Sequence, residues 1–359
     1  MAHEIKIIET QNSRIAEFDQ ENIGFGKIFS DHMFVCDYDG QNWVNPTIMP
    51  YEPILLSPAT SALHYGQAIF EGMKAFNYNG DVALFRPLEN WNRLNISAER
   101  MVMPDVPQDL FMEGLTKLIH IDRAWVPESV GSSLYIRPFM FGTDDHVGVR
   151  PSQHYKLIIF CCPVGPYYSN PLKVKVEEHY SRSAPGGTGF AKCAGNYGGS
   201  LYATKKAQEE GFDQVLWTDP ITHKFVEETG TTNIFAVIGD KVVTPAAGET
   251  LLNGITRDSV IQVIEKMGVE LEERLLAVEE LKEAHRSGQL KELFITGTAA
   301  TLINLDGFSH KGEYFDVMKT GNTDLSKQIK STLDGIRYGE VPDTFGWIQI
   351  VDHMVLRAH

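Results

Sequence analysis

The chain has 359 residues, of which 43% are hydrophobic and 22% are charged, and its formal net charge is −15. This composition is typical of a globular protein of about two domains, and it excludes a disordered or fibrous chain. Because the charge is strongly negative and the sequence has no run of lysine or arginine, nucleic acid and anionic membranes are disfavoured as partners.

The N-terminal stretch MAHEIKIIETQNSR lacks the apolar core of a signal peptide, and no later apolar run is long enough to span a membrane. The four cysteines show neither zinc-type spacing nor the density of a disulfide framework. No HExxH or similar metal-ligand pattern occurs among the histidines. We therefore expect a cytoplasmic protein with reduced thiols and no metal ion.

The first half of the chain predicts one clear helix and two buried strands. Apolar residues recur at helical spacing in residues 88–101, and the helix should end before Pro104. Arg93 lies off the apolar stripe of this helix, so it faces either solvent or a ligand. The segments 132–141 and 155–162 are rich in aromatic and aliphatic residues and are bounded by Gly or Pro, which is typical of buried strands.

A stiff, irregular segment follows these strands. The stretch PVGPYYSNP holds three prolines and one glycine, which interrupt regular structure. We therefore predict an N-terminal domain in residues 1–162, an interdomain loop in residues 163–173 and a C-terminal domain in residues 174–359.

The second half predicts a hairpin, a helix and a strand that ends in a turn. Residues 233–245 form two apolar strands around Gly239-Asp240, a pair that suits a tight turn. Residues 256–268 form a helix with Thr256 as its N-cap, and the start of this helix can hold an anion. Residues 292–300 read as a strand that enters a Gly-Thr turn. The fold class is therefore mixed α/β with substantial antiparallel sheet.

Lys192 lies in the glycine-rich stretch GGTGFAKCAGNYGG. A Walker-type phosphate loop would need Gly-Lys-Ser/Thr, and a dinucleotide fingerprint would need a glycine in place of Lys192. Two interpretations remain, a solvated lysine on a surface loop and a lysine that forms a Schiff base beside a flat cofactor. An aldehyde cofactor such as pyridoxal phosphate would also need an acidic partner for its ring nitrogen, and Glu228 is the candidate.

Seven stretches, in order, resemble fold-type IV aminotransferases, and most closely the branched-chain amino acid aminotransferases. They are LHYGQAIFEGMKAF, FRPLENWNRL, SLYIRPF, AKCAGNY, EETGTTNIF, LNGITRD and GTAA. Each is weak alone, but the ordered set covers nearly the whole chain. The resemblance implies a small N-terminal α/β domain, a larger C-terminal domain, an active site between them and a homodimer.

The resemblance also assigns roles to residues. Lys192 carries pyridoxal 5'-phosphate and moves the α-proton, and Glu228 pairs with the pyridine nitrogen. Tyr197 reaches the phenolic oxygen, while Arg93, Ile255, Thr256 and Thr298 bind the phosphate. Arginine offers a planar fork for phosphate, and the helix that starts at Thr256 adds amides and a favourable dipole.

The substrate residues are implied in the same way. Tyr135, Thr298 and Ala299 hold the α-carboxylate, and Arg137 meets the second carboxylate of glutamate within an apolar pocket. The walls of that pocket are expected from Tyr65, Phe70, Val164, Tyr167 and Ala300, with Val149 from a neighbouring subunit.

These roles describe a reversible transfer of the amino group from L-leucine, L-isoleucine or L-valine to 2-oxoglutarate in two half-reactions. Rivals of the same fold are a D-amino acid aminotransferase and a 4-amino-4-deoxychorismate lyase, which the YIRP stretch disfavours. A cofactor-free Schiff-base aldolase would leave Glu228 and Arg93 without a purpose. A catalytically silent binding protein would leave the complete set of site residues unexplained.

Overall fold

The computed structural model describes residues 4–166 and 170–352, and the chain divides into two compact units. The first unit comprises Met1–Tyr167, Ala191–Gly195 and Gly335–His359, and the second comprises Tyr168–Phe190 and Asn196–Asp334. The division thus differs from the predicted split at residues 163–173. Two later segments return to the first unit, so the predicted C-terminal domain loses both the segment around Lys192 and its last residues.

Strand pairing explains both returns. Strand β19 (Ile348–Ile350) pairs with β6 (Asp81–Phe85), which binds the last part of the chain to the first sheet. An isolated bridge between Ile69 and Cys193 does the same for the segment around Lys192. Pairings between residues so far apart in sequence leave no trace in local residue patterns.

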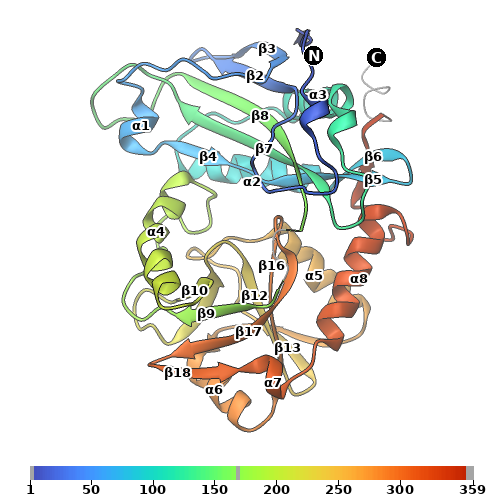
Figure 1. Ribbon diagram of the computed structural model, residues 1–359. Coiled ribbons are helices and arrows are strands. Elements are labelled where there is room, and N and C mark those ends of the chain that lie inside the picture. The colour runs from blue at the N-terminus through green and yellow to red at the C-terminus, as the bar shows by residue number, and fades with distance from the viewer. Residues whose placement is uncertain (1–3, 167–169, 353–359) are drawn as a thin grey trace. The chain divides into compact units, whose positions relative to one another are not determined.

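Among the described residues, the first unit forms a nine-stranded, largely antiparallel sheet (Figure 1). The path is β1-β3-β2-β8-β7-β5-β6-β19, and β4 pairs with β7. The remaining strands of this sheet are β1 (Lys6–Ile7), β2 (His32–Tyr38), β3 (Trp43–Pro50), β4 (Ala68–Phe70), β5 (Met73–Tyr78), β7 (Ser133–Gly142) and β8 (Tyr155–Val164). Strands β7 and β8 confirm the two buried strands that the sequence predicts.

Two helices pack against this sheet. Helix α2 (Pro87–Arg100) confirms the helix predicted over residues 88–101, and α3 (Gln108–Ile121) contacts β2 and β3. Leu94 and Leu110 on these helices and Phe34 on β2 are fully buried in one apolar core. Burial of each such side chain contributes roughly 1.5–3 kcal/mol. The short elements of this unit are α1 (Ser61–Tyr65) and the 3-10 turns Ile15–Glu17 and Arg123–Trp125.

The second unit is built on a ten-stranded sheet, counted over the described residues, that closes on itself. Its path is β14-β13-β12-β16-β17-β9-β10-β11-β15, and β18 pairs with β17. An additional pairing between β11 and β12, through Glu228 and Asn233, joins strands β12, β16, β17, β9, β10 and β11 into a ring. Glu228 therefore lies at the point where this ring closes.

The bounds of these strands follow the chain. They are β9 (Leu172–Val176), β10 (Gln214–Thr218), β11 (Phe225–Thr229), β12 (Asn233–Ile238), β13 (Lys241–Thr244), β14 (Glu270–Glu273), β15 (Leu276–Ala277), β16 (Leu290–Gly297), β17 (Thr301–His310) and β18 (Glu313–Asp316). Strands β12 and β13 confirm the predicted hairpin, and Gly239 in its turn has a φ of 63°. A positive φ at this position is the reason that glycine suits the turn.

Helix α5 (Ile255–Lys266) confirms the predicted helix but corrects its cap. The N-cap is Gly254, so Thr256 is the second helical residue. This position has no room for a side chain, because a Cβ on Gly254 would lie 2.2 Å from Asn233 Oδ1. The prediction was wrong since threonine is the commoner cap by residue type, whereas this close approach depends on tertiary contacts.

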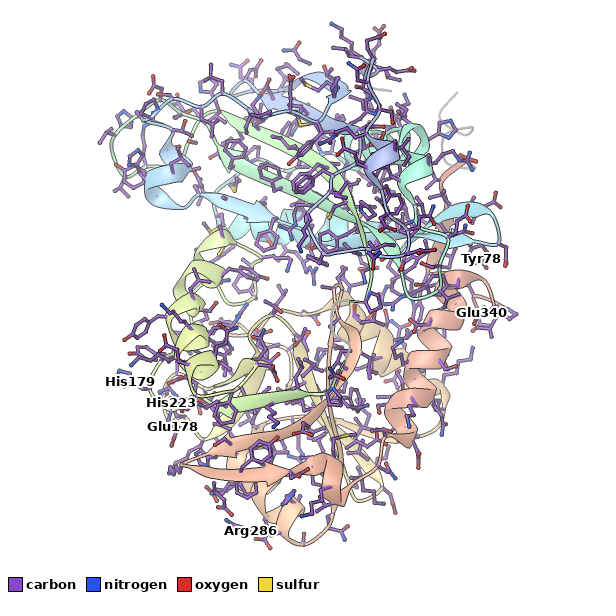
Figure 2. All side chains as sticks on the ribbon, viewed as in Figure 1. Tyr78, Glu178, His179, His223, Arg286 and Glu340 are labelled. Atoms are coloured by element: carbon purple, nitrogen blue, oxygen red, sulfur yellow. The ribbon has the colours of Figure 1, made fainter. Side chains whose placement is uncertain are left out.

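The other helices of the chain are α4 (Ala194–Glu209), α6 (Val278–Arg286), α7 (Val317–Thr320) and α8 (Asp324–Tyr338). No helix in the described parts has the length and apolar character that a membrane span requires. Charged side chains such as Glu178 and Arg286 of the second unit extend into solvent (Figure 2). All four cysteines are free and buried.

Candidate active site

The backbone of Lys192 is fixed on both sides within the first unit. Its N–H donates to Ser97 Oγ at 2.9 Å, and its carbonyl accepts from the N–H of Phe70 at 3.0 Å. Ser97 also donates to the carbonyl of Arg93 on the same helix at 2.9 Å. The segment that carries Lys192 is thereby bound to α2 and β4, and the side chain starts from a rigid base.

The ring of Phe70 lies against two cations. Lys192 Nζ and Arg137 Cζ are each 4.7 Å from the centroid of this ring. Both distances are within the range of a cation–π contact. Phe70 thus brings together two residues to which the resemblance assigns the cofactor and the substrate carboxylate.

Arg93 forms a buried ion pair that the sequence analysis does not include. Its Nε and Nη2 donate to the two carboxylate oxygens of Glu71 at 2.7 and 2.9 Å, and Asn90 Nδ2 donates to Glu71 Oε2 at 2.7 Å. Glu71 is fully buried. Burial alone would raise the pKa of Glu71, but the charge of Arg93, helped by Lys192, holds that pKa below its usual value. The pair fixes the plane of the Arg93 guanidinium.

Tyr135 and Arg137 leave the same face of β7. Arg137 Nη2 donates to Tyr135 Oη at 2.9 Å, and Tyr135 packs with Val164 in a small apolar cluster. Gly72 lies against the tyrosine, since a Cβ at this position would be 2.3 Å from Tyr135 Oη. Arg137 Nε is buried and has no hydrogen-bond partner among the described residues. A buried, unpartnered guanidinium nitrogen suits a site that receives an anion.

Glu228 is held within the second unit by three neighbours. Arg182 Nη1 lies 2.8 Å from Glu228 Oε1, and the N–H of Leu252 donates to the same oxygen at 3.3 Å. Asn233 Nδ2 is 3.5 Å from Oε2. Both side chains of the ion pair are nearly buried, at 5% and 4% exposed for Arg182 and Glu228. A nearby guanidinium and a backbone N–H both favour the ionised carboxylate.

The start of α5 follows this cluster in the chain. The Leu252 N–H donates to Glu228, and the Leu252 carbonyl accepts from Asn233 Nδ2 at 2.8 Å. The helix begins three residues later, at Ile255. Its N-cap is glycine, and no cap side chain forms a hydrogen bond with the helix. The start of a helix favours an anion because of the helix dipole and the amides of the first turn.

Comparison with known proteins identifies the family of the chain. The sequence model of the family described as amino-transferase class IV matches residues 68–305. A probable branched-chain-amino-acid aminotransferase of Staphylococcus epidermidis is 44% identical over 97% of this chain and 98% of its own length. The chain belongs to the class IV aminotransferase family. A branched-chain-amino-acid transaminase of Bacillus subtilis is also 44% identical, over 92% of this chain and 94% of its own.

Solved structures agree on the fold of this class IV aminotransferase. The branched-chain amino acid aminotransferase of Escherichia coli covers 90% of this chain with a TM-score of 0.72 and 24% identity. The branched-chain amino acid aminotransferase of T.th., solved with pyridoxamine 5'-phosphate, covers 92% of this chain with a TM-score of 0.74 and 23% identity. Each alignment includes 99% of the solved chain. The predicted fold-type IV architecture is confirmed.

Some predicted site residues of this aminotransferase lie outside the clusters around Lys192 and Glu228. Tyr65 is 37% exposed and Val149 is 90% exposed, so neither forms a buried pocket wall within this chain. Tyr167 lies outside the described residues. Thr298 and Ala299 are half-buried and Ala300 is buried, all in the turn between β16 and β17. Tyr197 is half-buried in the first turns of α4, and Thr256 is buried at the start of α5.

Three important residues of this aminotransferase were missed by sequence reasoning. Glu71 and Gly72 lie inside the quoted stretch LHYGQAIFEGMKAF, where the acidic residue within an apolar run was an available signal. Arg182 lies ten residues before Lys192, and no local pattern marks it. In the absence of a structure, its pairing with Glu228 across 46 positions of sequence could not be inferred.

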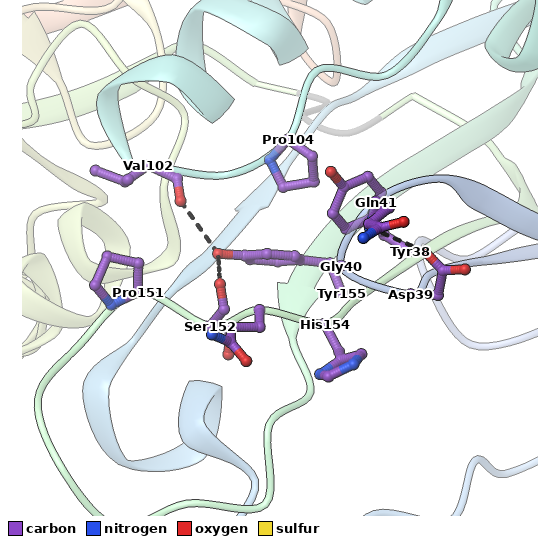
Figure 3. A pocket seen from close by; sticks show the side chains of 11 residues that line it. Tyr38, Asp39, Gly40, Gln41, Val102, Pro104, Pro151, Ser152, His154 and Tyr155 are labelled. Carbon is purple, nitrogen blue, oxygen red and sulfur yellow. Dashed lines mark hydrogen bonds between the residues drawn. The ribbon is translucent and has the colours of Figure 1, made fainter.

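A cavity of about 570 Å³ in the first unit is a separate feature (Figure 3). None of the predicted site residues lines it. Tyr155 Oη contacts the carbonyl oxygens of Ser152 and Val102 at 2.6 and 3.1 Å, so this polar group is already engaged inside the protein. Volume alone therefore does not locate the chemistry of this aminotransferase.

Proposed function

We propose that this protein is a pyridoxal 5'-phosphate-dependent transaminase that moves the amino group of L-leucine, L-isoleucine or L-valine to 2-oxoglutarate. The products are the branched-chain 2-oxo acid and L-glutamate, and the two half-reactions alternate on one site. The names of full-length relatives at 42–44% identity support the substrate class. The observation that carries the proposal is the Lys192, Phe70 and Arg137 group, where a lysine and a carboxylate-binding cation contact one ring.

The donor set fits the cofactor. A phosphate needs amides and cations, and α5 begins after a glycine cap while Arg93 is held by Glu71. A pyridine nitrogen needs a buried carboxylate, and Glu228 is buried at 3% exposed. We assign Lys192, Arg93, Tyr197, Glu228, Ile255, Thr256 and Thr298 to cofactor binding. When bound, pyridoxal phosphate withdraws electrons from the α-carbon of the amino acid through its ring.

The protein's own residues then have distinct tasks. With the cofactor bound, the Glu228 carboxylate would accept a hydrogen bond from the protonated ring nitrogen, and the Lys192 amine would take the proton from the α-carbon of the amino acid and later give it back. Arg93 would bind the phosphate while Glu71 holds the plane of its guanidinium. Phe70 packs against the Lys192 amine, whose Nζ lies 4.7 Å from the ring centroid.

The substrate's carboxylates are assigned to the cation and hydroxyl on β7. Tyr135, with the amides of Thr298 and Ala299, binds the α-carboxylate, and Arg137 binds the second carboxylate of glutamate through its unpartnered Nε. Phe70, Val164, Tyr65, Tyr167 and Ala300 are assigned to the apolar side of the pocket. Such a site accepts both an aliphatic chain and a dicarboxylate.

We also propose a homodimer in which Val149 serves the neighbouring subunit. Exposed apolar side chains gather on helix α1, on the loop before it and on the loop that the Thr60–Asp145 bridge joins to it. They include Leu55 before α1 and Leu63 on α1, at 99% and 64% exposed, and Val147 and Val149, at 73% and 90% exposed. Such a patch marks an interface. Light scattering should give twice the chain mass, and Val149→Asp should weaken the dimer; a monomeric wild-type protein would remove this assignment.

The cytoplasm is the proposed location, and the free, buried thiols favour it.

The visible spectrum of the purified protein tests the function. A yellow cofactor band that bleaches on addition of L-leucine, with no oxo acid present, supports the cofactor and the substrate class together. A band that bleaches with D-leucine and not with L-leucine would assign the chain to the D-amino acid branch of the fold. A colourless protein that cannot be reconstituted with pyridoxal phosphate would favour a cofactor-free lyase.

A further inference from the structure

Arg182 is a nearly buried cation that the proposed reaction does not use. Its Nη1 lies 2.8 Å from Glu228 Oε1, and the same nitrogen donates to the carbonyls of Thr250 at 3.0 Å and Gly189 at 3.2 Å. Arginine is always charged and presents its donors in a fixed plane, so these contacts define the position of the group. One side chain therefore joins three separate segments of the second unit.

The joined segments are each close to an assigned residue in sequence. Gly189 precedes Lys192 by three positions, Thr250 precedes the start of α5, and Glu228 is on β11. Gly189 packs closely against its neighbour, because a Cβ on it would be 2.4 Å from the carbonyl oxygen of Thr250. The N–H of Phe190 also donates to the carbonyl of Glu249 at 3.1 Å. The segments that contain Gly189 and Thr250 therefore pack directly against each other, and Arg182 donates to both.

Two adjacent glutamates share this surrounding, but only Glu228 forms an ion pair with the guanidinium in the described part of the chain. Glu227 is 7% exposed and accepts from Thr250 Oγ1, while its Oε2 has no hydrogen-bond partner among the described residues. Burial raises the pKa of Glu227 to about 7, and the charges of Glu228 and Asp219 add to this effect while Arg182 opposes it. One buried cation beside two carboxylates stabilises one negative charge far better than two.

We propose that Arg182 is a positioning residue that keeps Glu228 ionised, orients its carboxylate toward the ring nitrogen of the cofactor and couples it to the loop before α5. This inference rests on the proposed function, because Glu228 needs a cofactor nitrogen as its partner. A buried carboxylate that loses its cation takes up a proton, and a neutral Glu228 no longer holds the proton at the ring nitrogen. Arg182 therefore acts through Glu228 and not on the substrate itself.

The test uses the holoenzyme with Arg182→Gln, Arg182→Lys and a control, Arg274→Gln. Arg274 also joins carboxylates and a carbonyl in the second unit, through Glu272, Glu280 and Leu275, but it does not contact Glu228. With ¹⁵N-labelled cofactor, the NMR shift of the ring nitrogen reports its protonation directly. The pH dependence of that shift and the separate kcat and KM values for L-leucine complete the readout.

We expect Arg182→Gln to shift the ring nitrogen toward its unprotonated form and to lower kcat by about 10- to 100-fold, with little change in KM. Arg182→Lys should recover most of the protonation, and Arg274→Gln should resemble the wild type. A purely structural role would give variants that lose cofactor affinity and thermal stability while the remaining bound cofactor keeps the wild-type shift. That result would overturn the inference.

A measurement on the wild type covers the case in which Arg182→Gln does not fold. The ¹³C shift of the Glu228 carboxyl, assigned through Glu228→Gln in the cofactor-free protein, should show an ionised group over the whole pH range of the folded state. A Glu228 carboxyl that titrates near neutral pH would contradict the inference. Failure of the wild type to bind pyridoxal phosphate would instead reject the proposed function, so the two failures are distinct.

Discussion

The two units each contain a buried Arg–Glu pair, and the pairs differ in which partner is assigned to the chemistry. In the first unit Arg93 is assigned to phosphate, and Glu71 holds it with both oxygens. In the second unit Glu228 is assigned to the ring nitrogen, and Arg182 contacts one of its oxygens. In the first unit Glu71, which holds the residue assigned to the chemistry, is the more buried member of the pair and has no exposed surface.

This difference has an energetic meaning. A buried pair adds little net stability by itself, but removal of one partner leaves an uncompensated buried charge. In the first unit the two-point contact fixes a plane, which suits a guanidinium that must meet phosphate. In the second unit Arg182 Nη1 lies 2.8 Å from Oε1, and Asn233 Nδ2 lies 3.5 Å from Oε2.

The largest expected effect is on the first pair. Glu71→Gln leaves Arg93 buried without its counter-charge, so the free energy of unfolding should fall by about 3–5 kcal/mol in urea titrations. The matched control is Glu273→Gln, since Glu273 also pairs with a buried arginine, Arg257, but is 43% exposed. That variant should cost less than about 1 kcal/mol. Equal losses for the two variants would mean that burial of the carboxylate does not matter.

The second pair should show its effect in catalysis. Glu228→Gln should retain the cofactor but lower kcat by at least about 100-fold, because a neutral amide cannot keep the ring nitrogen protonated. The neighbouring variant Glu227→Gln replaces a second buried carboxyl, which is not assigned to the cofactor, and should keep a turnover near that of the wild type. Stopped-flow measurement of the L-leucine half-reaction compares them. Near-normal turnover in Glu228→Gln would remove this residue from the mechanism.

Arg137 should separate the two substrates. In the proposed function its guanidinium binds a carboxylate that only glutamate has in its side chain, so Arg137→Ala should slow the glutamate half-reaction by about 10- to 100-fold more than the leucine half-reaction. Tyr135→Phe removes the hydroxyl that Arg137 contacts and should slow both half-reactions similarly, since both substrates have an α-carboxylate. Equal losses in Arg137→Ala would show that its role is structural.

The smallest effect concerns Glu227 and pH. Burial raises the pKa of this carboxyl from 4.5 to about 7, so the folded state binds a proton more tightly than the unfolded state. Stability from this group is therefore present below pH 4.5 and is lost as the pH rises toward 7. Glu227→Gln should remove this dependence and raise the free energy of unfolding by about 1–2 kcal/mol above pH 7. If the free energy of unfolding depended on pH in the same way in the wild type and the variant, burial would not raise the pKa of Glu227.

Local patterns predicted the elements and the residue types of the site, but they did not predict its internal pairs. Helix α2, strands β7 and β8 and the β12–β13 hairpin follow from apolar spacing and turn residues. The roles of Lys192 and Glu228 came from the resemblance, because a lysine among glycines is ambiguous by itself. Spacing could not show that Arg93 meets Glu71, since their contact depends on how α2 packs near β4.

The same limit explains the remaining differences. Thr256 is a good cap by residue type, yet Gly254 takes the position because Asn233 approaches it closely. The return of the last part of the chain to the first unit depends on β19 meeting β6. Both features are set by contacts between distant parts of the chain, which residue periodicity does not encode.

The central claim is that Lys192 carries the cofactor, and one measurement tests it most directly. The purified holoenzyme is reduced with borohydride, digested and analysed by mass spectrometry to locate the cofactor on the chain. We predict that a single peptide, the one that contains Lys192, carries the added mass of the reduced cofactor. Label on Lys74, the buried lysine of β5, or on no lysine at all would contradict the account.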